Sequence, residues 1–336
     1  MSPDHCPARR ALLTRGACAA LIPWTGLGAA TGAWAQTPPA ALRILATGPG
    51  GTIPDIVARR YAEQLAAPYP GGIVVDNRVG AAGRVAVAAL KQAAGDGRTL
   101  LLAQGAVASV YPFLYPKLAY DPVTDLRPVS VAAEAVLGLA VGPRVPETVV
   151  DLRGLVDWVR ANPSLASYGS PGVGTLPHLM VALLAAEQRL DWTHVPYPGG
   201  PAALVDLMAG RLAALALPEG LLRPLQAAGK LRVLAVSGPR RSDFLPGVRS
   251  VVEQGFPMLE MREWFAFFLP GEASAATAEA ASRAVRDAAQ QPALQAALAE
   301  AGMVAVASTP DGLRQRIADE RPYWQRVMAT TGVNAE

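Results

Sequence analysis

Cysteine and histidine are scarce in this chain, which limits the chemistry that it can support. Its 336 residues include two cysteines and three histidines, and both cysteines, Cys6 and Cys18, precede Ala35. Beyond that segment there is no thiol, so we expect neither a disulfide framework nor a thiolate metal site. Only His178 and His194 remain, too few for the usual histidine and cysteine ligand sets of zinc or iron. The sequence therefore predicts no metal and no cofactor.

Charged residues and long apolar runs are also few. Asp, Glu, Lys and Arg make up 17% of the chain, and the formal net charge is +3. Removing the residues before Ala35 takes away three arginines and one aspartate and lowers this charge to +1. A nearly neutral chain provides no electrostatic basis for a nucleic-acid partner. After Ala35 no apolar run is long enough to span a bilayer.

The glycine-rich segments complete no nucleotide-binding or hydrolase motif. Gly48-x-Gly50 has no third glycine at position 53, so the dinucleotide fingerprint is incomplete, and no Gly-Lys-Ser/Thr follows to form a phosphate-binding loop. Ser170 is not in the Gly-x-Ser-x-Gly turn of a hydrolase, because Tyr168 occupies the first glycine position. These absences indicate a protein without catalytic residues.

A secreted α/β hydrolase is the alternative of a different class. It would need Ser170 as nucleophile and His178 as base. His178 lies within the start of an expected helix, so this pairing would require the chain to fold back on itself. We interpret His178 as a capping or pocket-lining residue and His194 as a packing residue. The sequence therefore predicts that the protein is not an enzyme.

The segment Met1–Ala35 has the organisation of a secretory signal peptide. It contains the arginine pair Arg9-Arg10, then a core of small and apolar residues, and it ends in Ala33-Trp34-Ala35, which fits the small-x-small cleavage rule. Paired arginines are typical of the twin-arginine route, and the general secretion route stays open. We expect cleavage after Ala35 and a periplasmic protein.

Strands and helices are expected to alternate in the first part of the remaining chain. Apolar runs at 44–46, 72–77 and 99–103 are typical of buried strands, and helical patterns follow the first two. This order predicts a parallel, doubly wound sheet. Ligands on such sheets bind beyond the carboxyl ends of the strands, so residues 47–55, 77–84 and 104–109 should converge. Extended segments at 126–141 and 261–270 would connect this lobe with a second one.

Glycine-rich turns lead into helix starts at three places, 47–52, 169–178 and 195–201. A proline lies close to the start of each following helix, where its missing N–H costs nothing. None of the three turns contains lysine or arginine, so an anion bound there would be held mainly by backbone N–H groups and helix dipoles. This arrangement favours reversible binding of a small carboxylate over phosphoryl chemistry.

A series of short motifs follows a fixed order along the chain. The motifs are Gly50-Gly51 with Asp55 to Arg59, Val75 to Gly83, Asp96 to Leu100, Tyr120 to Leu126, Gly172 to Leu179, His194 to Gly200, Arg240 to Ser242, and Trp264-Phe265. Their order and spacing, from about Leu42 to Val333, resemble the Bug family, the extracytoplasmic solute receptors of tripartite tricarboxylate transporters.

The resemblance implies an α/β protein with the two-lobed type II periplasmic-binding-protein fold. Each lobe would be a mostly parallel sheet flanked by helices, with the ligand in the cleft between the lobes. After a signal peptide at 1–35, we expect the first lobe at 36–137 and 263–336 and the second lobe at 138–262. Such a monomeric receptor would capture a small carboxylate (a di- or tricarboxylate, an acidic amino acid or an aromatic acid) for the permease subunits of the transporter. A receptor that presents its ligand to a sensor kinase is the alternative.

The resemblance also implies which residues contact the ligand. In the family, backbone amides of the first glycine loop and of the loop resembling Ser170 to His178 hold the carboxylate. The residues carried over are Gly50, Gly51, Thr52, Asp55, Gln104, Gly105, Ser170, Gly174, Thr175, His178, Tyr197, Gly200 and Ala202.

Three further positions are expected to affect specificity. Thr47 stands where the family usually has phenylalanine, which would reshape the first loop. Arg84 stands where a small polar residue is usual, and it would either reach a second acid group or remain a solvated charge at a helix end. Trp264 would be either a wall of the pocket or a core residue.

Overall fold

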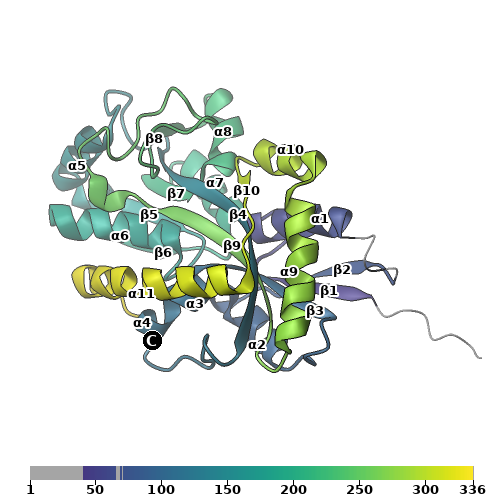
Figure 1. The fold of residues 1–336 in the computed structure, drawn as a ribbon. Helices are drawn as coiled ribbons and strands as arrows, with labels where there is room; N and C mark the ends of the chain where they lie inside the picture. The colour runs from purple at the N-terminus through teal and green to yellow at the C-terminus, as the bar shows by residue number, and fades with distance from the viewer. Residues whose placement is uncertain (1–40, 66–68, 70, 336) are drawn as a thin grey trace, which may run out of the picture. The chain divides into compact units, whose positions relative to one another are not determined.

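The computed structural model describes residues 41–65, 69 and 71–335. The predicted signal peptide and its cleavage site therefore lie outside the described residues. No helix in the described part is long and apolar enough to cross a membrane. The described residues form an α/β fold in which the strands belong to one continuous, curled sheet with helices packed on its faces (Figure 1).

The N-terminal strands build one half of this sheet. Strands and helices alternate here as the sequence predicts, in the order β1 (Leu42–Ala46), α1 (Ile53–Gln64), β2 (Ile73–Asn77), α2 (Arg84–Lys91) and β3 (Thr99–Gln104). β1 lies between β2 and β3 and pairs with both in parallel. Because β1 and β3 are apolar and largely buried, helices cover both of their faces.

Two long strands cross the middle of the sheet and run antiparallel to each other. β9 (Arg262–Pro270) pairs with β3 on one side and with β4 (Leu126–Val141) on the other. The pairing of β4 with β9 ends at Val136, and from Leu137 onward β4 pairs with β7 (Ala214–Pro218) and β8 (Arg232–Val236). β4 therefore carries the chain from one half of the sheet into the other.

The second half of the sheet contains β5 (Ser167–Ser170) and β6 (Thr193–Pro196), and β5 pairs in parallel with β6 and β7. The strand order is β2-β1-β3-β9-β4-β7-β5-β6, and β8 and the short β10 (Val304–Ala305) pair with β4 outside this path. The outer strands thus pair in parallel as predicted, and the two crossing strands add antiparallel pairs at the centre. The helices of this half are α5 (Leu152–Ala161), α6 (Leu176–Gln188), α7 (Gly200–Met208) and α8 (Glu219–Ala227).

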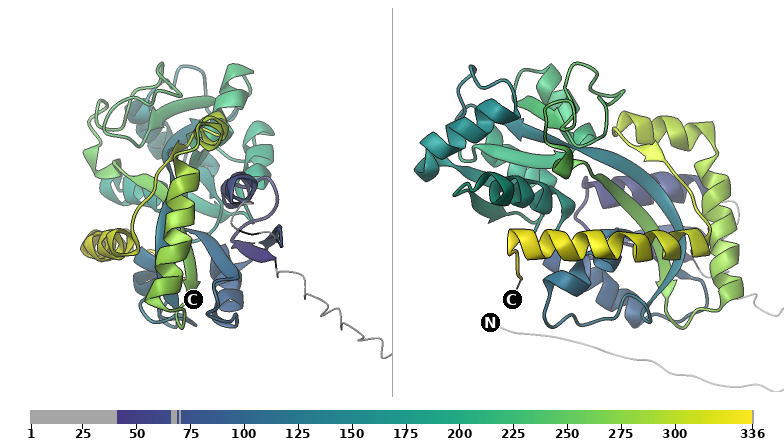
Figure 2. Two further views of the ribbon diagram at one scale, coloured as in Figure 1. Left: turned by 45° about the vertical axis from the view of Figure 1, so that its right-hand side comes forward. Right: turned by 60° about the vertical axis from the view of Figure 1, so that its left-hand side comes forward.

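Of the remaining helices, α11 (Pro310–Thr331) ties the two halves together. Two others, α3 (Ala106–Ser109) and α4 (Tyr111–Leu114), follow β3, and the C-terminal part also contains α9 (Ala275–Ala289) and α10 (Pro292–Glu300). α11 lies beside α6 of the second half and beside α3 and α4 of the first (Figures 1 and 2). It is also bound to the crossing strands, because Trp264 Nε1 donates to Glu320 at 2.8 Å and Arg316 pairs with Glu134.

The apolar core lies on both faces of the sheet. One cluster packs under α2, α6 and α11, a second under α1 and α9, and a third under α7 and α8. Together these clusters fix the strand ends and the turns that follow them, which is where the cavity described next is found.

Candidate ligand-binding site

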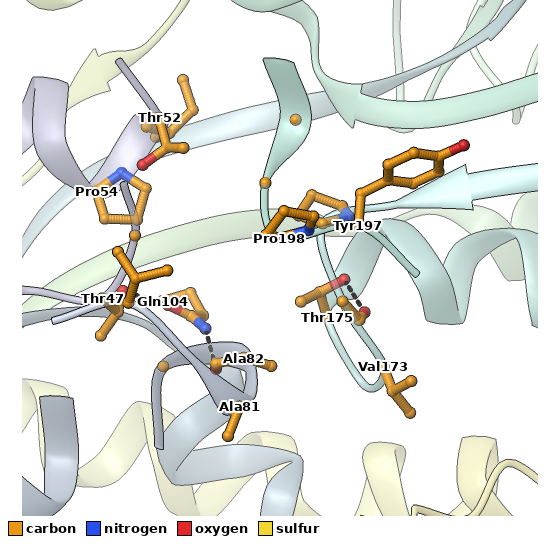
Figure 3. A pocket seen from close by; sticks show the side chains of 18 of the residues that line it. Thr47, Thr52, Pro54, Ala81, Ala82, Gln104, Val173, Thr175, Tyr197 and Pro198 are labelled. Atoms are coloured by element: carbon orange, nitrogen blue, oxygen red, sulfur yellow. Dashed lines mark hydrogen bonds between the residues drawn. The ribbon is translucent and has the colours of Figure 1, made fainter. Parts of the chain in front are cut away.

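A cavity of about 560 Å³ lies where the carboxyl ends of β1, β2 and β3 face the turns that follow β5 and β6 and the junction of β7 with α8. Figure 3 shows Thr47, Thr52 and Gln104 on one side of it and Thr175 and Tyr197 on the other. This volume is within the range of small-molecule sites. The lining is mainly apolar and consists of Thr47, Gly48, Pro49, Thr52, Ile53, Pro54, Val79, Gly80, Ala81, Ala82, Gly83, Arg84, Gln104, Tyr115, Pro171, Gly172, Val173, Thr175, Tyr197, Pro198, Gly199, Gly200, Leu217, Pro218, Leu221, Glu263, Phe265, Asn334 and Ala335.

Three helices begin at this cavity. Their N-cap residues are Thr52 for α1, Thr175 for α6 and Gly199 for α7, and all three line it. None of the three caps its helix with a side-chain hydrogen bond. The positive ends of three helix dipoles and their first-turn N–H groups therefore meet at one place, which is a suitable environment for an anion.

The first glycine turn is held by its own hydrogen bonds. Gly50 and Gly51 form its exposed tip and do not line the cavity, and Gly51 has a φ of +79°, which glycine adopts readily. The Thr52 hydroxyl donates to the Pro49 carbonyl at 2.7 Å, and the Gly51 N–H donates to the Asp55 carboxylate at 2.9 Å. The structure thus places Thr52 at the cavity, while the Gly51 amide is already used within the turn.

Asp55 supports this turn from behind and does not line the cavity. Its buried carboxylate accepts hydrogen bonds from Gly51 N, Arg59 Nε at 2.9 Å and Asn77 Nδ2 at 3.0 Å. Burial alone would raise the Asp55 pKa, but these donors together hold it below its ordinary value. Asp55 therefore remains ionised and orders the turn.

The turn between β2 and α2 forms the floor on the side of the first half. Ala81 and Ala82 have φ values of +46° and +52°, which are uncommon for residues other than glycine. The Ala82 carbonyl accepts from Gln104 Nε2 at 2.8 Å and from the Tyr111 hydroxyl at 2.7 Å, and Gln104 Oε1 accepts from the Thr47 hydroxyl at 2.7 Å. Thr47 and Gln104 line the cavity as part of this network, so their polar groups are held in fixed positions.

The loop after β5 presents its backbone to the cavity and its polar side chains to the interior. Ser170 is fully buried, and its hydroxyl lies 2.7 Å from His194 Nε2. His178 Nδ1 accepts from Gly174 N at 3.0 Å, and the His178 and His194 rings stack with their centroids 3.8 Å apart. Burial lowers the pKa of His178 to about 3 and that of His194 to about 4. Ser170, Gly174 and His178 thus support the loop and do not line the cavity, whereas Thr175 does.

The partner of Ser170 differs from the pair that the hydrolase alternative would need. It is His194, not His178: β5 and β6 pair in parallel, which places His194 opposite Tyr168, two residues before Ser170 on the same face of β5. His194 was expected only to pack, and it also makes this hydrogen bond. A fully buried serine that does not line the cavity has no access to a substrate. The hydrogen bond is structural.

The third turn follows β6. Tyr197 and Gly200 line the cavity, and the Tyr197 hydroxyl donates to Asp206 Oδ2 at 2.6 Å, which fixes the ring in place. Ala202 is exposed on α7 and does not line the cavity.

Arg84 lies at the cavity, whereas Gly105 and Trp264 lie behind its wall. Arg84 Nε donates to the Ala81 carbonyl at 3.2 Å, and its guanidinium carbon is 3.9 Å from the centre of the Tyr115 ring. Trp264 is buried against α11, and a Cβ on Gly105 would lie 2.1 Å from the Trp264 ring. Gly105 is therefore needed for packing.

Several lining residues were not identified from the sequence. The most informative is Glu263, a buried acid on β9. Its only sequence signal is a charge directly before the apolar run Trp264 to Leu269. The others had no distinctive signal; they include Leu217, Leu221, Asn334 and Ala335. In the described part of the chain, no three His, Cys, Asp or Glu residues gather in a metal-binding group.

Comparisons with known proteins agree with this architecture. A family model described as tripartite tricarboxylate transporter family receptor, TctC, matches residues 57–333. Protein BugT of Bordetella pertussis is 32% identical over 286 residues, which cover 84% of this chain and 86% of BugT. A solved periplasmic transporter is 28% identical, with a TM-score of 0.82, over 89% of this chain and 99% of its own. The R. palustris protein Rpa4515, solved with adipate, is 26% identical, with a TM-score of 0.83, over 88% of this chain and 98% of its own.

The family resemblance and the fold class expected from the sequence are thereby confirmed. Members of this family are periplasmic solute-binding receptors and not enzymes, which agrees with a cavity that has no nucleophile–base pair among the described residues that line it. The chain belongs to the TctC (Bug) family of tripartite tricarboxylate transporter receptors.

Proposed function

We propose that this receptor binds a small organic carboxylate in the cavity between the two halves of its sheet. The observation that carries the proposal is the convergence of α1, α6 and α7, whose N-caps all line the cavity without side-chain caps. Each helix end carries a partial charge of roughly +0.5, which attracts an anion without any lysine. Rpa4515, which is similar to this chain, was solved with adipate, a dicarboxylate, and this supports the same ligand class.

The proposal is tested by a thermal-shift screen of the purified protein. The panel contains mono-, di- and tricarboxylates, amino acids and aromatic acids, and each acid is compared with its uncharged amide. An acid with micromolar affinity should stabilise the folded state by roughly 4 kcal/mol at millimolar concentration, because ligand binds only that state. Amides should give no shift. If no acid shifts the midpoint and the denatured protein releases no bound acid, the proposal is wrong.

We further infer two lobes that close on the ligand, at 36–137 with 263–336 and at 138–262. This division is supported by β4, which exchanges β9 for β7 as its partner between Val136 and Leu137. Bending of β4 and β9 at this point would move one lobe against the other. The closed form would then be recognised by the permease subunits, which is tested by uptake of the identified acid in cells with and without the permease.

The receptor is proposed to reach the periplasm through removal of Met1–Ala35. The periplasmic location of the family supports this. N-terminal sequencing of protein recovered from the periplasm should begin at Gln36. Recovery of the intact chain from the membrane fraction would instead indicate an uncleaved anchor.

A further inference from the structure

Glu263 is a buried acid in the cavity wall, close to the point where β4 passes from one half of the sheet to the other. It lies on β9 opposite Ala135 of β4, one residue pair from the place where β4 leaves β9 for the other half of the sheet. It lines the cavity and is only 5% exposed. Among the described lining residues it is the one acid, and Arg84 is the one cation.

The Glu263 carboxyl has no partner among the residues that the structure describes. Neither a hydrogen bond nor an ion pair to it is formed within the ranges 41–65 and 71–335, and burial is the one influence on its pKa there. Asp55, in contrast, is equally buried but accepts three hydrogen bonds. Arg84 does not neutralise Glu263, because its guanidinium stacks on Tyr115 and bonds to Ala81.

Burying such a carboxyl in its ionised form is unfavourable unless another group contacts it. Buried carboxylates in proteins are normally paired, because desolvation of an unpaired charge is unfavourable. Burial raises the Glu263 pKa to about 8, so in the unliganded protein the carboxyl keeps its proton at neutral pH, and it would release this proton when a cation binds beside it. The side that remains open to Glu263 is the cavity, so the missing partner is expected to be part of the ligand.

We propose that Glu263 binds an ammonium group of the ligand, so that the receptor selects carboxylates that also carry an amine, such as amino acids, over plain carboxylates. This inference rests on the proposed function, because the helix N-termini and Arg84 would hold the carboxylate of the same ligand. A zwitterion matches a cavity with one acid and one cation. A plain dicarboxylate would bring two further negative charges beside Glu263, which would then remain protonated and form no ion pair with the ligand. The apolar walls, including Leu217, Leu221 and Phe265, suit the carbon skeleton of the ligand.

The test compares matched pairs of compounds that differ in the amine. Suitable pairs are phenylalanine with 3-phenylpropanoate, leucine with 4-methylpentanoate, and glutamate with glutarate. We expect calorimetry at neutral pH to show that, in the best-binding pair, the amine-bearing member binds about tenfold to about a hundredfold more tightly, which is the usual effect of a charged hydrogen bond.

The variant Glu263→Gln should remove most of this preference by weakening the amine-bearing member, with little effect on its deaminated partner. Glu219→Gln is the matched control, because Glu219 is also a buried glutamate but lies outside this cavity. It should keep the preference. Glu263→Asp, which retains the charge on a shorter side chain, should give an intermediate preference and guards against a misfolded glutamine variant.

The outcomes separate this inference from the proposed function. If plain carboxylates bind as tightly as their amine-bearing partners, or if Glu263→Gln leaves the preference unchanged, Glu263 does not bind an ammonium group while the carboxylate receptor stands. If neither member of any pair binds, and neither does any other acid, the proposed function itself fails.

Discussion

The stacked histidines behind the loop after β5 should make the folded state sensitive to acid. Burial lowers the pKa of His178 to about 3 and that of His194 to about 4, while both titrate near 6.5 in an unfolded chain. Below about pH 6.5 the unfolded chain therefore binds protons that the folded chain does not, and stability decreases as the pH falls towards 4. For His178 we expect a loss of roughly 2 kcal/mol by about pH 5.

This prediction is checked by urea unfolding at a series of pH values. In His178→Asn the amide oxygen can still accept the hydrogen bond from Gly174 N, but the side chain does not titrate. The variant should be somewhat less stable than the original protein at pH 8 because it loses the ring stacking. It should also lose less stability on acidification. If the unfolding free energy falls equally steeply with pH in both proteins, His178 does not cause the sensitivity to acid.

Glu263 should have the opposite pH dependence in the unliganded protein. Its pKa is raised from 4.5 to about 8, so between these values the folded chain holds a proton that the unfolded chain has released. Its contribution is fully present below pH 4.5 and is lost as the pH rises through 8, amounting to a few kcal/mol. Glu263→Gln should therefore become more stable than the original protein on the alkaline side.

The measurement is again urea unfolding, without ligand, from pH 5 to 9. The difference between the unfolding free energies of Glu263→Gln and the original protein should grow as the pH rises. The histidine contribution should cancel in this difference, because both proteins contain His178 and His194. A constant difference over the whole range would mean that Glu263 is already ionised at pH 5.

At the scale of single elements, the first glycine turn depends on Asp55. Its carboxylate binds the turn at Gly51, α1 at Arg59 and β2 at Asn77. Asp55→Asn keeps the size but loses the charge and places a donor where acceptors are needed, so we expect a loss of about 1–3 kcal/mol in unfolding free energy. Ligand affinity should fall as well, because Thr52 and the start of α1 line the cavity.

Asp76→Asn is the control for this change. Asp76 lies on the same strand as Asn77 but pairs with Arg78 at the surface, where ion pairs contribute little. Its unfolding free energy and ligand affinity should stay nearly unchanged. If both variants lose the same affinity, the effect is one of surface charge and not of the turn.

Elements were easier to predict than the directions of side chains. The apolar runs of β1 and β3, and the glycine and proline at helix starts, depend on local chemistry, so alternation and helix ends could be derived from the sequence. Thr52, Gln104, Thr175, Tyr197 and Gly200 do line the cavity. Asp55, Ser170 and His178 belong to the same motifs but turn towards the backbone behind it, and motif spacing alone does not determine this direction.

Contacts between segments far apart in the sequence explain why some cavity-lining residues were not predicted. Glu263 reaches the cavity because β9 is inserted between β3 and β4, which are distant from it along the chain. Likewise, Asn334 and Ala335 reach it because α11 returns along α6 and α3. No local pattern specifies either contact, so a residue-by-residue reading assigns Glu263 to an ordinary strand end.

At the scale of the whole molecule, the turn after β1 and the turn after β6 lie on opposite sides of the cavity and come into contact at Gly199. A Cβ on this residue would lie 3.0 Å from Thr52 Cγ2 and 3.6 Å from Pro49 Cγ, across the cavity from its own turn. The φ of Gly199 is 163°, which any residue adopts, so an alanine here would be hindered only by this contact. The two turns would relieve the contact by moving apart, which would oppose the proposed lobe closure.

We therefore expect Gly199→Ala to bind its acid about fivefold more weakly, because crowding a packed contact costs about 1 kcal/mol or more. Small-angle X-ray scattering should show a larger radius of gyration for the liganded variant than for the liganded original protein.

Gly247→Ala is the control, since a Cβ there meets nothing within 4 Å. It should share any stabilisation that comes from reduced freedom of the unfolded chain but not the change in affinity. Equal affinity and equal size for Gly199→Ala and the original protein would mean that Thr52 yields locally, and that the contact between the two turns does not limit closure.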